Sequence, residues 1–216
     1  NHGINNTEEQ ALQIAKQQHG EDALVEGIYT VVNPKTTNFF SEVVYAGLDK
    51  TREVLGEYNF LGISNASKTN IAFTDKVSQT NTENFSENPN TPLSVNQINH
   101  SRGSLTSSNA ITAQWQQGVT NVPISSITYN GAAANAQRTA NMLKELNEQQ
   151  EFKVYQSTHQ DDWVGTLIGG NESTGGESTG LLNAHSAYGS SANRDQADSA
   201  WGLGNTSIMI EVKPNN

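Results

Sequence analysis

The sequence predicts an α/β domain in which a mostly parallel β-sheet lies between two layers of helices. Apolar runs of strand length alternate along the chain with segments that carry apolar residues at helical spacing. The connections between strands are long enough for crossovers, which parallel pairing requires. The length of 216 residues suits one large domain. Together these observations predict a three-layer α/β/α sandwich.

The first half of the chain predicts two helices around one strand. A short amphipathic helix is expected over 7–19, with Thr7 as its N-cap. The apolar run 27–34 predicts a strand that ends at an Asn-Pro pair, because proline cannot donate to a sheet ladder. Residues 38–56 have the apolar spacing of a helix, whereas the polar, Asn- and Pro-rich stretch 76–92 is typical of a loop.

The second half alternates more regularly. The expected elements are, in order, strand 93–98, helix 104–118, strand 123–131, helix 133–149, strand 151–158, helix 195–201 and strand 207–212. A glycine-rich connection over 172–180, ESTGGESTG, predicts a surface loop or a lid. We therefore divide the chain into an N-terminal helical extension, 1–26, and a single domain, 27–216.

Composition excludes several classes of function. The net charge of −10 argues against a nucleic-acid partner, because binding phosphates needs a positive surface. The absence of cysteine excludes disulfides and thiol nucleophiles. No apolar run approaches the ~20 residues of a membrane span. Asn, Gln, Ser and Thr make up over a third of the chain, a composition common in secreted bacterial surface proteins. Because the chain begins at Asn1 without Met or a signal peptide, we expect it to be a piece of a longer protein.

The sequence after strand 93–98 resembles a nucleophile turn. Active sites of open α/β sheets lie at the carboxyl ends of the strands. There Asn99-His100-Ser101-Arg102-Gly103 leads directly into a helix, as in the strained strand-to-helix turn that exposes a serine hydroxyl. Gly103 provides the small residue needed two positions after the serine, whereas Asn99 stands where glycine is usual. The alternative is that Ser101 is an ordinary helix N-cap.

The expected oxyanion donor is the backbone N–H of Arg102 at the helix N-terminus. A second donor is expected among residues 33–38. The Arg102 side chain is expected to point to solvent or, alternatively, to meet a lipid phosphate.

The base and the acid are expected later in the chain. A serine nucleophile needs a base, which is itself oriented by a carboxylate. Asp161 and Asp162 follow strand 151–158, and His185 comes after the glycine-rich connection, so the order is Ser, Asp, His. The alternative is that these residues cap turns or lie at the surface. The sequence therefore predicts a Ser101–Asp162–His185 triad, with Asp161 as the alternative acid.

Two further histidines flank this group. His100 and His159 are expected to support turns by hydrogen bonding. A metal site of His100, His159, Asp161 and Asp162 is an alternative, but no helix-spaced ligand pair supports it. No metal or cofactor is therefore predicted.

Several segments of the chain resemble one family. They are QINHSRGSLTSSNAI, STHQDDWVGTLIGGNESTGG, AHSAYG and YTVVNPKTTNFFSEVVYAGLDKTREVLG. They look like the hydrolase-like C-terminal regions of filamentous-haemagglutinin-type exoproteins of two-partner secretion, including contact-dependent growth inhibition proteins. The resemblance spans roughly 27–202. One departure is Ala187, where a cysteine is expected in these relatives.

A more distant similarity is to the acid and base segments of α/β-hydrolase lipases, and it favours Asp162 over Asp161. The resemblance implies a minimal α/β-hydrolase-like fold and a serine esterase of the lipase or phospholipase class. It also implies a toxin domain that is secreted or displayed at the cell surface as part of a larger exoprotein, with a lipid or other ester as substrate and a cognate immunity protein as a further expected partner.

Two other functions compete with this one. A non-enzymatic adhesin or interaction module would suit the Asn-, Ser- and Thr-rich composition, but the sequence has no 20–30-residue period of a β-solenoid. A nuclease toxin would suit the exoprotein resemblance, but the acidic charge argues against it.

Overall fold

The computed structural model describes residues 39–55, 62–85, 92–148, 150–176, 184–185, 188 and 208–210. The expected elements over 7–19, 27–34 and 195–201 lie outside these residues, as does the expected boundary between 26 and 27.

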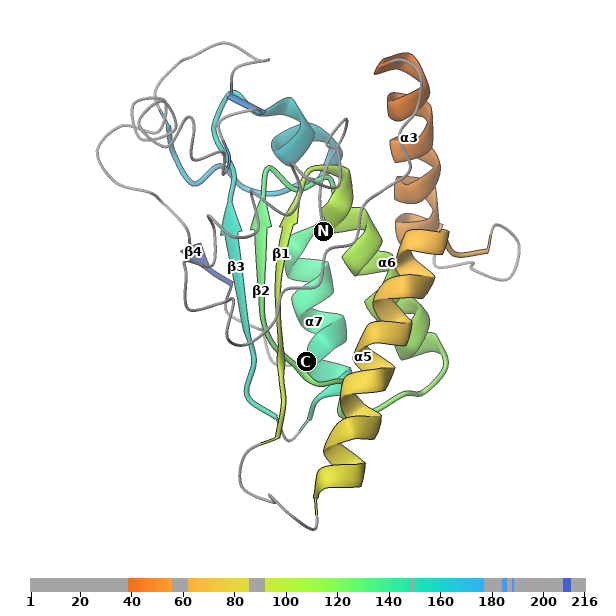
Figure 1. Ribbon diagram of the computed structural model, residues 1–216. Helices are drawn as coiled ribbons and strands as arrows, with labels where there is room; N and C mark the ends of the chain where they lie inside the picture. Colours follow the sequence, from red (N-terminus) through yellow and green to blue (C-terminus); the bar gives the residue numbers. More distant parts are fainter. Residues whose placement is uncertain are drawn as a thin grey trace.

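A four-stranded sheet forms the centre of the described structure. Its strands are β1 (Val95–His100), β2 (Ile124–Asn130), β3 (Lys153–Ser157) and β4 (Ile208–Met209), paired in that order. The first three strands are parallel, and β4 is antiparallel to β3. The α/β class predicted from the sequence is confirmed, with a mixed sheet. The parallel strands end together at one edge, the upper edge in Figure 1.

The helices pack beside this sheet as crossovers require. Helix α6 (Arg102–Gln116) connects β1 to β2, and helix α7 (Ala136–Leu146) connects β2 to β3. The two helices pack against each other, and α3 (Phe39–Leu55) and α5 (Asn65–Asn84) pack on α6 (Figure 1). After β3 the chain forms a single π-helical turn, η1 (Val164–Ile168), at the carboxyl edge of the sheet (Figure 1).

The prediction of a loop over 76–92 is wrong as far as residue 84, because α5 continues to Asn84. The buried face of α5 is mostly polar, although Phe73 and Val77 pack on the apolar core, so its apolar periodicity is weak. This face is held by hydrogen bonds to α6. The Ser67 hydroxyl donates to the carbonyl of Thr106 at 3.0 Å, and Gln114 donates to the Thr74 hydroxyl at 3.1 Å.

The core of the described structure mixes polar and apolar side chains. Its main apolar cluster joins the sheet to α6 and α7 and includes Ile111, Ile127, Tyr129, Leu143 and Val154. Helix α6 is buried on all sides from Arg102 to Gln114 and carries mostly Ser, Thr, Asn and Ala there. Polar side chains are as numerous as apolar ones among the buried residues of the described part.

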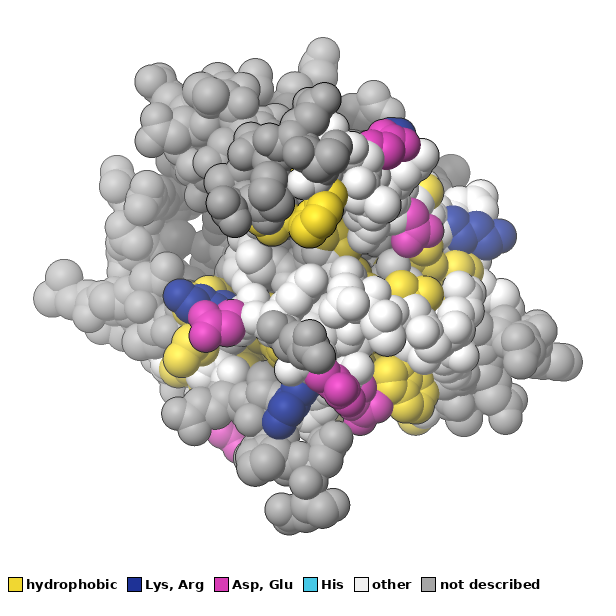
Figure 2. Space-filling view, turned by 90° about the horizontal axis from the view of Figure 1, so that it is seen from below, with side chains coloured by type: hydrophobic (Ala, Val, Ile, Leu, Met, Phe, Trp, Pro, Cys, Tyr) yellow, Lys and Arg dark blue, Asp and Glu magenta, His cyan; other side chains and the backbone are white. Residues whose placement is uncertain are grey.

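One face of the described structure carries few charged side chains. Figure 2 shows the end of the molecule where the strands begin, and uncharged groups cover most of its described area. The basic side chains on this face stand apart from one another rather than forming a patch (Figure 2). Within the described ranges, no helix has both the length and the hydropathy of a membrane span.

Candidate active site

Ser101 occupies a strained turn between β1 and α6. Its φ of 52° and ψ of −129° are unusual for a residue with a side chain. The surrounding backbone enforces this conformation: the Ser101 N–H donates to the carbonyl of Asn130, and the Ser101 carbonyl accepts from the N–H groups of Ser104 and Ala133. Such strain persists only where neighbouring structure over-determines it, typically at functional sites.

The Ser101 hydroxyl does not cap helix α6. It lies 2.8 Å from Nε2 of His185 instead. The alternative of an ordinary N-cap serine is therefore wrong. Gly103, the small residue expected after the serine, lies buried in the first turn of α6.

His185 connects the serine to a carboxylate. Its Nδ1 lies 2.9 Å from Oδ1 of Asp162. An ionised carboxylate only accepts hydrogen bonds, so Nδ1 carries the proton and Nε2 is left to accept from the Ser101 hydroxyl. This tautomer is the one a general base requires. The His185 side chain is 22% exposed, which leaves one edge of the ring open.

Asp162 is the buried end of this chain of hydrogen bonds. Its Oδ1 also accepts from the backbone N–H groups of Val164 and Gly165, which begin η1. Burial alone would raise the pKa of Asp162. The hydrogen bond and charge of His185, together with the backbone hydrogen bond from Gly165, outweigh burial and hold the pKa below its usual value. The carboxylate at neutral pH is therefore ionised. Of the two candidate acids, the structure brings Asp162 to His185.

The two flanking histidines each support a turn. His100 donates from Nε2 to the carbonyl of His185 at 3.1 Å, and the two rings stack with centroids 5.1 Å apart. His159 is fully buried, and its Nδ1 accepts from the N–H of Asp161 at 3.1 Å. Among the described residues, no three His, Asp or Glu side chains stand close enough to hold a metal ion.

Arg102 begins helix α6 directly after the serine, so its backbone N–H belongs to the first helical turn. Both expectations for its side chain are wrong: it neither points to solvent nor lies open to a lipid phosphate. It is buried, and its Nε lies 2.9 Å from the carboxylate of Asp49 on α3. A buried guanidinium needs a partner of opposite charge, and α3 supplies it. The second oxyanion donor expected among 33–38 lies outside the described residues.

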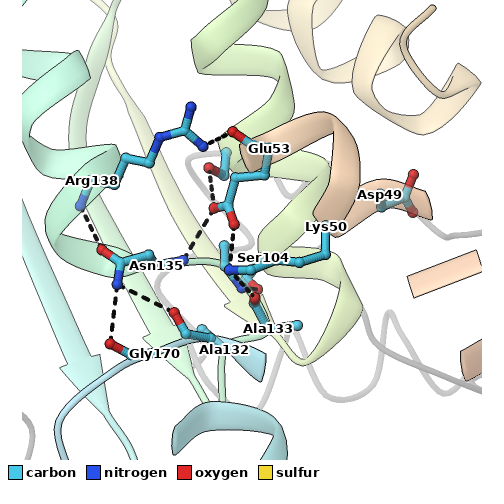
Figure 3. A network of polar contacts seen from close by, with 12 residues as sticks. Asp49, Lys50, Glu53, Ser104, Ala132, Ala133, Asn135, Arg138 and Gly170 are labelled. Atoms are coloured by element: carbon cyan, nitrogen blue, oxygen red, sulfur yellow. Dashed lines mark hydrogen bonds and ion pairs between the residues drawn. The ribbon is translucent and has the colours of Figure 1, made fainter. Parts of the chain in front are cut away.

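A network of polar contacts ties α3 to the segment after β2 (Figure 3). Glu53 is 1% exposed and accepts from Lys50 Nζ, from the Ser108 hydroxyl and from the backbone N–H of Asn135. Lys50 Nζ also donates to the carbonyl of Ala133, the residue whose N–H binds Ser101. The network thus links α3, through Ala133, to the turn that holds Ser101.

The segment after Asp162 is partly described. Residues 172–176, the start of the predicted lid or surface loop, run alongside the end of β3. The N–H of Thr174 donates to the carbonyl of Thr158, and that of Gln160 to the carbonyl of Gly175. Leu167 in η1 is 79% exposed, whereas Trp163 and Ile168 pack on the cluster around Leu105.

Two residues that sequence reasoning missed complete the site. Tyr188 lies three positions after His185 and is buried beside Asp162. Gly131 follows β2 with a φ of +52°, and a Cβ there would lie 2.5 Å from the Tyr188 ring and 2.6 Å from Oδ2 of Asp162. The position directly after a predicted strand is the signal that would have found Gly131.

We expect Gly131→Ala to destabilise the protein by about 3 kcal/mol, through a positive φ and a clash with Tyr188 and Asp162. Gly118→Ala is the matched control, because Gly118 has a φ of +68° and a Cβ added there would meet nothing within 4 Å. That control measures backbone strain alone, about 1 kcal/mol. Urea unfolding compares the two variants. Equal losses of stability would show that Gly131 has room for a side chain.

No protein-family model matches this chain, and no curated protein or solved structure is detectably similar to it. The geometry around Ser101, His185 and Asp162 is therefore the basis for assigning a function.

Proposed function

We propose that this domain is a serine hydrolase that cleaves carboxylic esters, with lipid esters as the substrate class. The observation that supports the proposal is a continuous chain of two hydrogen bonds. Ser101 Oγ lies 2.8 Å from His185 Nε2, and His185 Nδ1 lies 2.9 Å from Asp162 Oδ1. A nucleophile, a base and an orienting acid in this geometry are recognised by their roles, independently of the fold that carries them.

Acylation follows from the tautomer of His185. Ser101 Oγ attacks the ester carbonyl carbon while Nε2 of His185 takes the hydroxyl proton. The imidazolium that forms is stabilised by the charge of Asp162. When the tetrahedral intermediate collapses, the alcohol leaves with that proton and the acyl group remains on Ser101. Water then attacks the acyl-enzyme and gives one proton to His185. When this second intermediate collapses, that proton returns to Ser101 Oγ and the carboxylic acid leaves.

The oxyanion of each tetrahedral intermediate would form beside the first turn of α6. The Arg102 N–H and the positive end of that helix are the stabilising groups we assign to it. The second donor belongs to residues 33–38 in this proposal.

The wider proposal is an α/β-hydrolase-like domain with a three-layer sandwich. The parallel β1–α6–β2–α7–β3 unit and the serine between β1 and α6 support it. The resemblance to two-partner-secretion exoproteins supports a secreted toxin role, with an immunity protein as partner. The resemblance of the acid and base segments to those of α/β-hydrolase lipases supports lipid esters as the substrate class. The four described α-helices disfavour an adhesin built as a β-solenoid.

The test is a fluorophosphonate probe together with a panel of p-nitrophenyl esters and phospholipids. We expect stoichiometric labelling, hydrolysis of short esters and release of fatty acid from at least one phospholipid. Ser125→Ala, at the far end of β2, is the control for an unrelated hydroxyl and should behave as wild type. A wild-type protein that neither takes up the probe nor cleaves any ester would refute the proposal.

A further inference from the structure

The carbonyl group of Ser101 accepts hydrogen bonds from two segments of the chain. From α6 it accepts from the Ser104 hydroxyl at 2.6 Å and from the Ser104 N–H at 3.1 Å. From the segment after β2 it accepts from the N–H of Ala133 at 3.3 Å. The shortest of these bonds comes from a side chain, so Ser104 adds a donor that the backbone of the turn does not itself supply.

The Ser104 hydroxyl also binds the segment after β2. The side chain is fully buried, and its oxygen accepts from the backbone N–H of Ala134 at 2.9 Å. Ser104 therefore lies next to this segment (Figure 3). A hydroxyl has one proton to donate, and this one donates it to the carbonyl of Ser101. Through Ser104 and Ala133, helix α6 and the segment after β2 hold the same carbonyl oxygen.

The direction of this carbonyl sets the direction of the Arg102 N–H. The two groups belong to one peptide bond, which is trans and planar, so they point to opposite sides of it. The ψ of −129° at Ser101 describes how this peptide is turned relative to the serine. A residue that holds the carbonyl of Ser101 therefore also aims the N–H of Arg102.

We propose that Ser104 is a positioning residue for the oxyanion donor: by holding the Ser101 carbonyl, it aims the Arg102 N–H at the place where the oxyanion forms. The inference rests on the proposed hydrolase function, because that function gives the N–H an oxyanion to stabilise. Such a donor lowers the barrier when its direction is set before the charge develops. Ser104 acts through the peptide, whereas His185 acts on the proton of Ser101.

The experiment compares Ser104→Ala with Ser107→Ala. Ser107 lies on the same helix and is also fully buried, but its hydroxyl donates at 2.6 Å to Gln97 on β1 instead of to the serine turn. Each variant loses one buried hydroxyl, so the two should lose similar amounts of stability in urea unfolding. If Ser104→Ala does not fold, Ser104→Cys fills the site with a weaker donor and should show the same effects to a smaller extent.

For Ser104→Ala we expect kcat per active site to fall about tenfold, a part of the roughly 10²- to 10³-fold cost of losing an oxyanion donor altogether. KM should change less than about twofold, because the misdirected N–H weakens binding of the oxyanion and not of the ester. Active sites are counted with the fluorophosphonate probe. A trifluoromethyl ketone, whose adduct with the serine carries an oxyanion, should bind about tenfold more weakly. Ser107→Ala should match wild type in both measurements.

Solution NMR tests the same inference without an ester. In Ser104→Ala the residual dipolar coupling of the Arg102 N–H, which reports the direction of that bond, should differ from wild type. The Ala134 N–H, which loses its acceptor, should exchange with solvent faster. Ser107→Ala should change neither quantity.

The two kinds of measurement separate the possible failures. If wild type neither cleaves an ester nor takes up the probe, but Ser104→Ala turns the Arg102 N–H, the proposed function fails and the aiming of the peptide holds. If wild type is an esterase and a folded Ser104 variant keeps its kcat and its inhibitor binding, the positioning role is overturned while the hydrolase stands. An unchanged dipolar coupling at Arg102, or equal losses of kcat in Ser104→Ala and Ser107→Ala, also overturns the positioning role.

Discussion

Ser101→Ala is expected to abolish ester hydrolysis and probe labelling while leaving the protein folded. The loss in kcat should be about 10⁴- to 10⁶-fold, as for removal of a triad nucleophile. The reason is chemical: without Oγ no acyl-enzyme forms, and the only remaining catalysis comes from substrate binding and the oxyanion donors. The measurement is hydrolysis of the best ester of the panel, at protein concentrations high enough to detect the residual rate.

Two companion variants sharpen this expectation. Because the triad acts as a unit, Ser101→Ala combined with His185→Ala should cost no more activity than Ser101→Ala alone. Ser101→Gly should be equally inactive yet more stable than Ser101→Ala by about 1 kcal/mol, because glycine relieves the strain of φ 52°. A fully active Ser101→Ala protein would remove the serine from the mechanism. Additive losses in the double variant would show that Ser101 and His185 do not act as a unit.

Glu53→Ala is expected to destabilise the protein by about 3–5 kcal/mol, the usual loss when one partner of a buried ion pair is removed. The carboxylate lies 2.6 Å from Lys50 Nζ and accepts from Ser108 and Asn135 as well, so its loss leaves Lys50 without its counter-charge and the Ser108 and Asn135 donors without this acceptor. Arg138 binds the backbone carbonyl of Glu53 and cannot replace the carboxylate. Urea unfolding measures the change.

Glu83→Ala provides the control for this prediction. Glu83 is an exposed carboxylate on α5, hydrogen-bonded to Gln79, and its removal should change stability by less than about 0.5 kcal/mol. If Glu53→Ala and Glu83→Ala lose the same small amount of stability, the network around Glu53 is not a supporting structure for the serine turn.

The strand ends were the most predictable part of the site. Ser101 and Asp162 both follow predicted strands, and parallel strands bring their carboxyl ends to one edge, so the rule that places active sites there selected them together. His185 came from chain order alone. Position after the strand does not distinguish Asp161 from Asp162, and the resemblance to lipases favours Asp162. In the structure the turn into η1, where the Asp162 carboxylate accepts from two N–H groups, separates the two residues.

The polar parts of the fold could not be predicted in the same way. Helix α5 turns Ser67, Asn70 and Thr74 inward, so hydrophobic periodicity, the main signal for a helix, is weak there. The pairing of Arg102 with Asp49 joins residues that are 53 positions apart, and no local sequence pattern predicts it. The shape of the sandwich beyond the described helices stays a prediction.

The buried side chains of α6 include many hydroxyls and amides, and this composition affects how the stability of the domain changes with temperature. Unfolding normally raises the heat capacity because apolar groups enter water, whereas exposure of polar groups lowers it. A core in which Ser, Thr and Asn share the interior with Ala exposes less apolar area for the same number of buried residues. The free energy of unfolding of this domain therefore follows a flatter curve with temperature than that of an apolar-cored domain of equal length.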